Sequence, residues 1–312
     1  MEGCGRKLGP YDCCTVARVF PRRTKATPDD ALAFVGDPPL FLPKIDAVHI
    51  SVAFSWDIPE AKRLAAAWER IAPVIIGGPA VGTKGEDFHP GMYVKRGYVI
   101  TSRGCPNRCW FCSVWKRDGN VRELPITEGW NVLDDNLLAC SREHIERVFM
   151  MLKTQKNRVE FTGGLEAARL EYWSASALFD LKPAQMFFAY DTPDDWEPLQ
   201  ASADLLWEAG FRKDARSQAR AYVLIGYPKD TLEMADERLR QTWALGYLPM
   251  AMLYRDREGK YDQRWRRFQR LWARPALMRP RMKASEDLIA LAEAQPNLFK
   301  PKLVSTNKID RL

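Results

Sequence analysis

The chain has 312 residues, of which 46% are hydrophobic and 28% are charged, and this globular composition excludes the disordered and fibrous classes of protein. Its longest apolar runs have the length of strands and fall far short of the roughly 20 residues that a membrane-spanning helix needs. The net charge of +7 is concentrated at one end, because residues 254–312 carry 15 Lys and Arg against 7 Asp and Glu. This basic segment is a candidate contact surface for a polyanion, although a solvated basic face is the commoner explanation.

The first part of the chain predicts a small α/β region over residues 1–96. An irregular start contains one strand at 15–20. An apolar strand at 48–54 is then followed by helical spacing at 59–71 and by a second strand at 74–79. A strand, a helix and a strand in this order form a β-α-β unit, so we expect parallel strands.

From residue 97 strands and helices alternate regularly, and we expect an α/β fold of the partial (β/α)6 barrel type over residues 97–275. In such a parallel barrel the functional groups lie at the C-terminal ends of the strands. Residues 276–312 are expected to form a basic C-terminal tail with one helix near 285–294. The predicted barrel strands are 98–102, 130–136, 158–162, 185–190, 221–225 and 248–254, and the predicted helices are 141–153, 195–209 and 231–245.

Three cysteines follow the first barrel strand at the spacing C-x3-C-x2-C, namely Cys105, Cys109 and Cys112. Thiolates are soft ligands that select zinc or an iron–sulfur cluster. A structural zinc site is closed by four ligands, and no fourth Cys or His lies nearby in the sequence. A cluster held by three cysteines keeps one iron open for an exchangeable ligand. The spacing therefore favours a catalytic iron–sulfur cluster, with structural zinc and unligated cysteines as the alternatives.

This motif resembles the signature of the radical S-adenosylmethionine (radical SAM) enzymes, in which an aromatic residue precedes the last cysteine, as Phe111 does here. The resemblance implies a [4Fe–4S] cluster whose open iron chelates S-adenosylmethionine (SAM). It implies an enzyme that cleaves SAM to a 5′-deoxyadenosyl radical, which takes a hydrogen atom from the substrate. It also implies a six-unit partial barrel, and an electron donor such as a flavodoxin or ferredoxin.

Polar residues follow the second and fourth predicted barrel strands. Asp134, Asp135 and Asn136 place two carboxylates and an amide at the barrel mouth, where the resemblance implies contact with the ammonium group of SAM. A helix-capping turn is the alternative for this string. Asp191 ends the fourth strand and is a further candidate contact for the cofactor or the substrate. No residue is assigned a catalytic role from the sequence.

Glycine-rich strings follow the third and fifth predicted barrel strands. Gly163 and Gly164 lack a Cβ atom and so let the backbone approach a ligand closely. Glu166 would then reach the ribose hydroxyls or the methionyl part of SAM, while a tight turn without a ligand is the alternative. After the fifth strand, Gly226-Tyr227-Pro228 resembles the motif that lies beside the adenine in the family.

The end of the N-terminal region, where a strand is followed by Gly77-Gly78-Pro79, resembles the cobalamin-binding domain that precedes the barrel in one branch of the family. That domain presents a histidine to cobalt in a D-x-H-x-x-G string. The nearest string here is Asp87-Phe88-His89-Pro90-Gly91, which is one residue short, and the region is short as well. We therefore expect a shortened α/β region that does not bind cobalamin.

The other cysteines bear on the compartment of the protein. Seven cysteines, three of them in the cluster motif, suit a reducing interior better than a disulfide-forming compartment. Met1 to Arg6 lead into no apolar segment, so we expect a cytoplasmic protein without a signal peptide. Cys4, Cys13 and Cys14 are candidates for a second metal centre, but their spacing favours ordinary thiols.

No motif indicates the substrate. The basic C-terminal segment favours a nucleotide or a nucleic-acid base, and no membrane partner is expected. Trp265, Phe268 and Trp272 share one helical face, which either packs on the core or stacks on bases. The alternatives are a small metabolite or peptide as substrate, or a non-enzymatic iron–sulfur or zinc protein. The three-cysteine motif and the polar strings on separate strand ends argue against a protein without catalytic activity.

Overall fold

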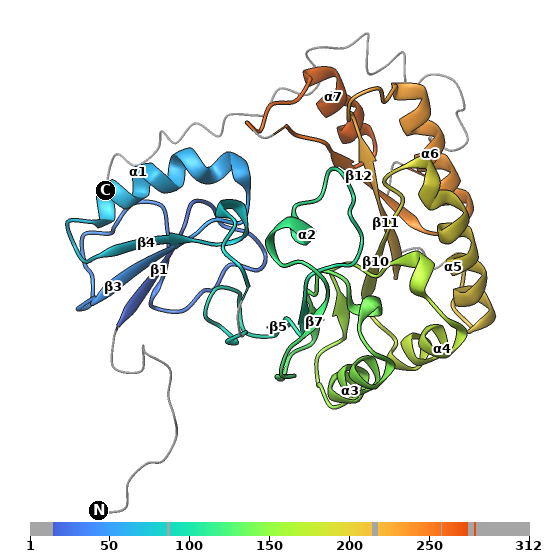
Figure 1. Ribbon diagram of the computed structural model, residues 1–312, viewed down its shortest axis with the longest axis horizontal. Helices are drawn as coiled ribbons and strands as arrows, with labels where there is room; N and C mark the ends of the chain where they lie inside the picture. The colour runs from blue at the N-terminus through green and yellow to red at the C-terminus, as the bar shows by residue number, and fades with distance from the viewer. Residues whose placement is uncertain (1–14, 86–87, 214–217, 257, 274–277, 279–312) are drawn as a thin grey trace, which may run out of the picture.

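A computed structural model describes residues 15–85, 88–213, 218–256, 258–273 and 278. These residues form two parallel sheets, one before and one after residue 97, which occupy opposite sides of the view in Figure 1. The predicted helix near 285–294 and the three N-terminal cysteines lie outside the described residues. None of the described helices is both long and apolar enough to cross a membrane.

The N-terminal sheet has the strand order β2-β1-β3-β4, and all of its pairs are parallel. One helix, α1, packs on it by burying Ala61, Leu64 and Trp68. The three predicted strands and the predicted helix are present, whereas β2 has only three residues and went unpredicted. The elements are β1 (Val16–Phe20), β2 (Ala33–Val35), β3 (Ala47–Ser51), α1 (Ile58–Trp68) and β4 (Val74–Gly77).

The second sheet has the strand order β12-β11-β10-β9-β8-β5, in which neighbours along the chain are neighbours in the sheet and every pair is parallel. This is the strand order of a (β/α)6 partial barrel, and no pairing within the described residues closes β5 on β12. The strands are β5 (Tyr98–Val99), β8 (Asn131–Val132), β9 (Glu160–Phe161), β10 (Gln185–Ala189), β11 (Ala219–Ile225) and β12 (Leu248–Leu253).

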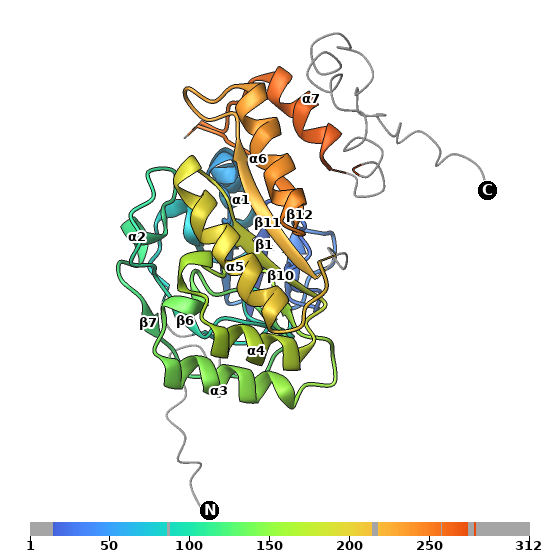
Figure 2. The ribbon, with the colours of Figure 1, turned by 90° about the vertical axis from the view of Figure 1, so that its right-hand side faces the viewer.

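Helices cover the outer face of this sheet, and Figure 2 shows α5 and α6 in front of strands β10 to β12, with α3 and α4 below them. The predicted helices 141–153 and 231–245 begin with N-caps, because the Ser141 and Thr231 hydroxyls accept hydrogen bonds from the first turns of α3 and α6. Helix α4 went unpredicted, since its apolar residues show little helical periodicity. The helices are α3 (Arg142–Lys153), α4 (Tyr172–Leu181), α5 (Trp196–Glu208), α6 (Leu232–Ala244) and α7 (Gln263–Leu271).

Two sequence interpretations are corrected by the packing. The predicted strand at 98–102 divides, because Ser102 and Arg103 leave the barrel as β6 (Ser102–Arg103) and pair antiparallel with β7 (Arg122–Glu123). The aromatic stripe of α7 faces the core, since Trp265, Phe268 and Trp272 are all buried. The base-stacking interpretation of that stripe is therefore wrong, because no face of these rings is open to a base.

Candidate metal and cofactor site

The three cysteines lie on a loop between the strands of the β6–β7 hairpin, immediately after barrel strand β5. The loop contains the short helix α2 (Val114–Arg117), and Figure 1 places it in front of the barrel strands on the side that faces the N-terminal sheet. Parallel strands present all their C-terminal ends at one edge of the sheet. The loop therefore meets the residues that follow β8, β9, β10 and β11.

Local hydrogen bonds hold the conformation of the cysteine loop. The Cys105 N–H donates to the Gly119 carbonyl at 3.0 Å. The Cys109 carbonyl accepts from the Cys112 N–H at 3.1 Å and from the Trp115 indole N–H at 3.1 Å. All three cysteines are free thiols of intermediate exposure. The loop thus presents three partly exposed sulfurs on a preformed turn.

The three thiols influence one another's ionisation. The pKa of Cys109 is raised to about 11, first by burial and then by Cys112, Cys105 and the carboxylates of Asp195 and Asp191. Burial also raises the pKa of Cys112, with Cys105 contributing. Thiols that disfavour each other's ionisation are stabilised as thiolates by a cationic centre bound among them.

The arrangement of the sulfurs bears on the kind of metal centre. No three His, Cys, Asp or Glu side chains in the described part of the chain are placed to hold a single metal ion. A tetrahedral zinc site needs its ligands to converge on one ion. In a cubane cluster each cysteine binds a different iron, so the sulfurs stand further apart. Three cysteines without a nearby fourth Cys or His in the sequence favour a cluster with an open iron over a closed zinc site.

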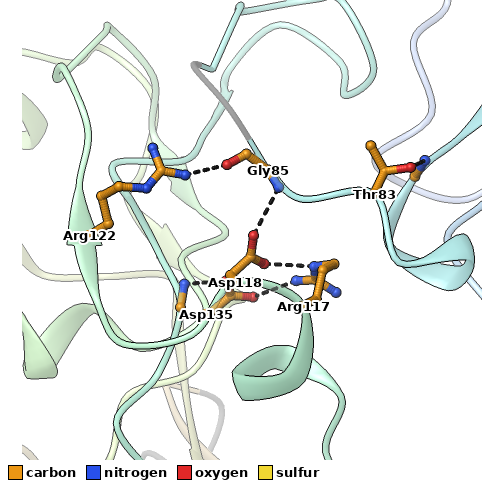
Figure 3. Close-up of polar contacts among 8 residues, drawn as sticks. Thr83, Gly85, Arg117, Asp118, Arg122 and Asp135 are labelled. Carbon is orange, nitrogen blue, oxygen red and sulfur yellow. Dashed lines mark hydrogen bonds and ion pairs between the residues drawn. The ribbon is translucent and has the colours of Figure 1, made fainter.

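A second set of contacts fixes the cysteine loop to both sheets (Figure 3). The Asp135 carboxylate accepts the Gly104 N–H at 2.9 Å and lies 3.5 Å from the Arg117 guanidinium. Arg117 also donates to Asp118 at 2.6 Å, and Asp118 accepts the N–H of Gly85, which follows the N-terminal sheet, at 2.8 Å. Asp135, which is predicted to contact SAM, positions the loop through these contacts.

Gly104 can only be a glycine. Its φ of +89° lies in the left-handed region that favours glycine, and an added Cβ atom would overlap the backbone carbonyl of Asn120. This conformation turns the chain from β6 into the cysteine loop. It also aims the Gly104 N–H at Asp135.

Asp134 does not face the barrel mouth, contrary to the sequence interpretation. Its carboxylate is 1% exposed and accepts the Thr101 N–H and hydroxyl at 2.6 Å each and the Ser102 hydroxyl at 2.7 Å. Burial raises its pKa to about 6. Asp134 therefore joins the end of β8 to the residues after β5, at the point where the hairpin leaves the barrel.

Asn136 is the member of this string that reaches the cysteines. Its side-chain N–H2 lies 3.4 Å from the Cys105 sulfur and 2.6 Å from a Glu166 carboxylate oxygen, in hydrogen-bonding geometry. Its carbonyl oxygen is buried and accepts no hydrogen bond from the described residues. A buried acceptor without a donor costs about 1–3 kcal/mol. The oxygen therefore suits an N–H group supplied by a ligand.

The glycines after β9 approach protein backbone and not a ligand. A Cβ atom at Gly163 would overlap the carbonyl of Asp134, and one at Gly164 would lie 3.0 Å from the carbonyl of Asp135. The absence of side chains lets the end of β9 pack on the end of β8. Gly163 and Gly164 thereby place Asn136 and Glu166 side by side, and the predicted ligand approach through these glycines has no support in the geometry.

We expect Gly163→Ala to destabilise the fold by roughly 1–3 kcal/mol, since the overlapping atom belongs to the backbone of Asp134 and cannot swing away. The measurement is urea unfolding of the purified variant. Gly77→Ala is the matched control, because the nearest atom to its Cβ would be the Thr83 hydroxyl at an ordinary 3.6 Å. Equal stability of the two variants would contradict this packing argument.

The ends of β10, β11 and β12 complete the mouth. Burial raises the pKa of Asp191 to about 7, with the Asp195 carboxylate contributing, and both carboxylates act on Cys109. Tyr227 after β11 and Tyr254 after β12 each place a ring centroid 5.7 Å from that of Trp110. Asp191 after β10 therefore acts electrostatically on the cysteine loop, and Tyr227 after β11 packs on its Trp110 ring.

The cysteine loop also carries aromatic side chains. The Trp110 ring is 49% exposed and packs edge-on against Phe111 at 5.3 Å. Beyond these rings a cavity of about 380 Å³ opens at the ends of β11 and β12. The cavity is lined by Gly226, Tyr227, Pro228, Tyr254, Asp256, Lys260, Tyr261 and Asp262.

Sequence reasoning missed Trp110, Arg117 and Asp118. An exposed tryptophan inside a three-cysteine loop is a local signal and could have been recognised. Nothing local marks Asp118, since its partner Gly85 is 33 residues away in the sequence. Such contacts appear only when the two sheets are brought together.

No protein-family model and no curated protein sequence matches the chain. Its structure is similar to that of the radical S-adenosylmethionine methyltransferase TsrM from Kitasatospora setae, solved with cobalamin and a [4Fe–4S] cluster bound. The TM-score is 0.56 at 11% sequence identity, and the match covers 77% of this chain and 75% of that one. The chain therefore shares the fold of that enzyme, a partial parallel barrel preceded by an α/β domain, and this is the fold that its motif predicted.

Proposed function

We propose that this protein is a radical SAM enzyme whose Cys105, Cys109 and Cys112 hold a [4Fe–4S] cluster. The observation that carries the proposal is the preformed loop, which presents three clustered thiols at the barrel mouth beside a buried acceptor without a donor. The similarity to TsrM supports it at the level of the fold. When bound, the cluster and SAM would supply the radical that takes hydrogen from a substrate.

The residues around the loop would bind and orient SAM. The Asn136 carbonyl oxygen would accept an N–H of its ammonium group, and the Asp191 carboxylate, which acts electrostatically on Cys109, would offer a second acceptor. Phe111, Trp110 and Tyr227 offer ring surfaces to the adenine. Glu166 reaches this region through Asn136, while Gly226 and Pro228 line the adjoining cavity.

The cavity at the ends of β11 and β12 indicates the class of ligand that the mouth can take. Its volume of about 380 Å³ lies within the range of small-molecule sites, and Tyr227, Tyr254 and Tyr261 give it an aromatic wall. Aromatic walls favour planar rings. A nucleotide or a nucleic-acid base therefore remains our proposal for the substrate, with a small metabolite or peptide as the alternative.

The experiment is anaerobic reconstitution followed by chemical reduction with SAM. We expect about four irons and four sulfides per chain, because three thiolates at this spacing suit one cubane. Reduced protein should then release 5′-deoxyadenosine and methionine. A flavodoxin or ferredoxin would serve as the physiological electron donor. Iron-free protein that binds one zinc would contradict the proposal, and so would a stable cluster that leaves SAM intact.

Radical methyl transfer is a second candidate, and the extent of the structural match favours it. Residues 97–312 are 216 of 312 residues, or 69% of the chain, so a match over 77% includes part of the N-terminal domain. The matched protein binds cobalamin, which weakens the expectation that this chain does not. The N-terminal domain also contains His49, which is buried inside β3, where its Nδ1 atom hydrogen bonds Tyr93 at 2.7 Å.

An absorbance spectrum separates the two reactions. Protein incubated with hydroxocobalamin and then desalted will show a stoichiometric corrin band if methyl transfer is the activity. Absence of the band would leave hydrogen abstraction without cobalamin as the proposal. Hexahistidine-free protein is needed, because a tag would itself bind cobalt.

A polymeric substrate can be separated from a free nucleotide by salt dependence. If the basic C-terminal segment receives a nucleic acid, affinity must fall steeply with salt as counterions are released. Anisotropy with single-stranded and duplex oligonucleotides at several salt concentrations tests this. Salt-independent or undetectable binding would restrict the proposal to free nucleotides and small molecules.

A further inference from the structure

A chain of three contacts links the Cys105 sulfur to the protein surface. The Asn136 amide N–H2 reaches the sulfur at 3.4 Å and a Glu166 oxygen at 2.6 Å. The same Glu166 oxygen accepts from the Arg169 guanidinium at 2.7 Å. Asn136 is 4% exposed, whereas Arg169 lines a cavity of about 510 Å³ on the outer side of the loop, together with Pro106.

Glu166 determines which end of the amide faces the sulfur. An ionised carboxylate only accepts hydrogen bonds, so the side chain of Asn136 must present its N–H2 group and not its carbonyl oxygen to Glu166. The Arg169 guanidinium donates to the same carboxylate oxygen at 2.7 Å and so fixes its position. With one N–H engaged by Glu166, the second N–H of the same group remains for Cys105. The orientation of the amide is therefore set by charge.

A donor at a cysteine ligand acts on the redox equilibrium of a cluster. An N–H···S hydrogen bond stabilises negative charge on the sulfur, and the reduced cluster carries one more negative charge than the oxidised cluster. The bond consequently favours the reduced form. Among the described residues, a side-chain donor reaches Cys105 and neither of the other two cysteines, so the effect would be confined to one iron of the centre.

We propose that Asn136 is a positioning residue that raises the reduction potential of the cluster by hydrogen bonding Cys105, with Glu166 and Arg169 holding its amide. The inference rests on the proposed function, since it requires a cluster on the three cysteines. The amide nitrogen of Asn136 would act on electron uptake by the cluster. The amide oxygen of the same side chain would remain available to bind SAM. One side chain thereby serves the cluster through nitrogen and the cofactor through oxygen.

The test is the midpoint potential of the reconstituted cluster without SAM, measured by EPR-monitored redox titration. Asn136→Leu keeps a similar volume and removes the donor. We expect a shift to lower potential that corresponds to about a tenfold change in the reduction equilibrium, or 59 mV for a one-electron couple. Asn136→Ser keeps a shorter donor and should fall between this variant and wild type.

Gln155→Leu is the matched control, because it removes an amide that bonds only residues 151 and 154 of its own helix end. Its potential should equal that of wild type. An Asn136→Leu protein with four irons and an unchanged potential would overturn the proposal. Loss of the cluster from both Asn136 variants would overturn it too, since Asn136 would then be needed for assembly. Failure of wild type to hold iron would instead show that the proposed function is wrong.

Discussion

Cys109→Ala is expected to abolish both the cluster and the release of 5′-deoxyadenosine. Removal of one of the three thiolates leaves a cubane with two protein ligands. Two ligands hold the cluster too weakly for it to stay bound. We expect loss of the brown absorbance, an iron content near zero after desalting, and SAM cleavage at the background rate. Iron analysis and chromatography of the reduced reaction mixture check these outcomes.

Cys140→Ser is the matched control for this prediction. Cys140 is also a free thiol, and it lies beside the cysteine loop in the wall of the outer cavity, but it is not part of the motif. Burial raises its pKa to about 12, which makes it a poor source of thiolate. The control should keep its iron and its activity. A Cys109→Ala protein with full cluster content would remove the central assignment.

Asp134→Ala is expected to have the largest effect on stability. The substitution leaves the Thr101 N–H and two hydroxyls without their shared acceptor inside the fold. It also creates a cavity where the cysteine hairpin leaves the barrel. Buried donors without partners cost about 1–3 kcal/mol each, so we expect a loss of about 3 kcal/mol in the free energy of unfolding. Urea unfolding at fixed pH measures it.

The pH dependence of this loss distinguishes the buried carboxyl from other causes. The pKa of Asp134 in the fold is raised to about 6 from the ordinary value of 3.8. Its contribution to stability is therefore fully present below about pH 4 and falls as the pH rises through 6. The cost of Asp134→Ala should be larger at pH 4 than at pH 7. Asp37→Ala, at an exposed carboxylate, is the control and should change stability little at either pH.

Several features of the protein could be read from local pattern. The cysteine spacing predicts a metal centre without knowledge of the fold, because three thiolates within eight residues must lie close together in the chain. The alternation of apolar strands and amphipathic helices predicted a parallel α/β fold, and the structure confirms it. Caps at Ser141 and Thr231 were also local, since a cap bonds only the next turn of its helix.

The string after β8 shows that local pattern cannot distinguish the contacts of adjacent polar residues. Asp134, Asp135 and Asn136 are adjacent polar residues that look equivalent in the sequence. In the structure one is buried under the hairpin, one holds the Gly104 N–H and one reaches Cys105. Successive side chains of an extended segment point in different directions, so each meets a different neighbour.

The pattern of residues along the chain was enough to predict the fold class, the successive strands of the barrel and the three thiols of the candidate metal centre. Tertiary structure alone decided which polar side chains face that centre. Asn136 and Cys105 are 31 residues apart, and Asp118 and Gly85 are 33 apart, so neither contact exists until the strands pair and the two sheets meet. The physical reason is that a hydrogen bond depends on position and direction in space, whereas residue type and spacing along the chain record only what can be bonded.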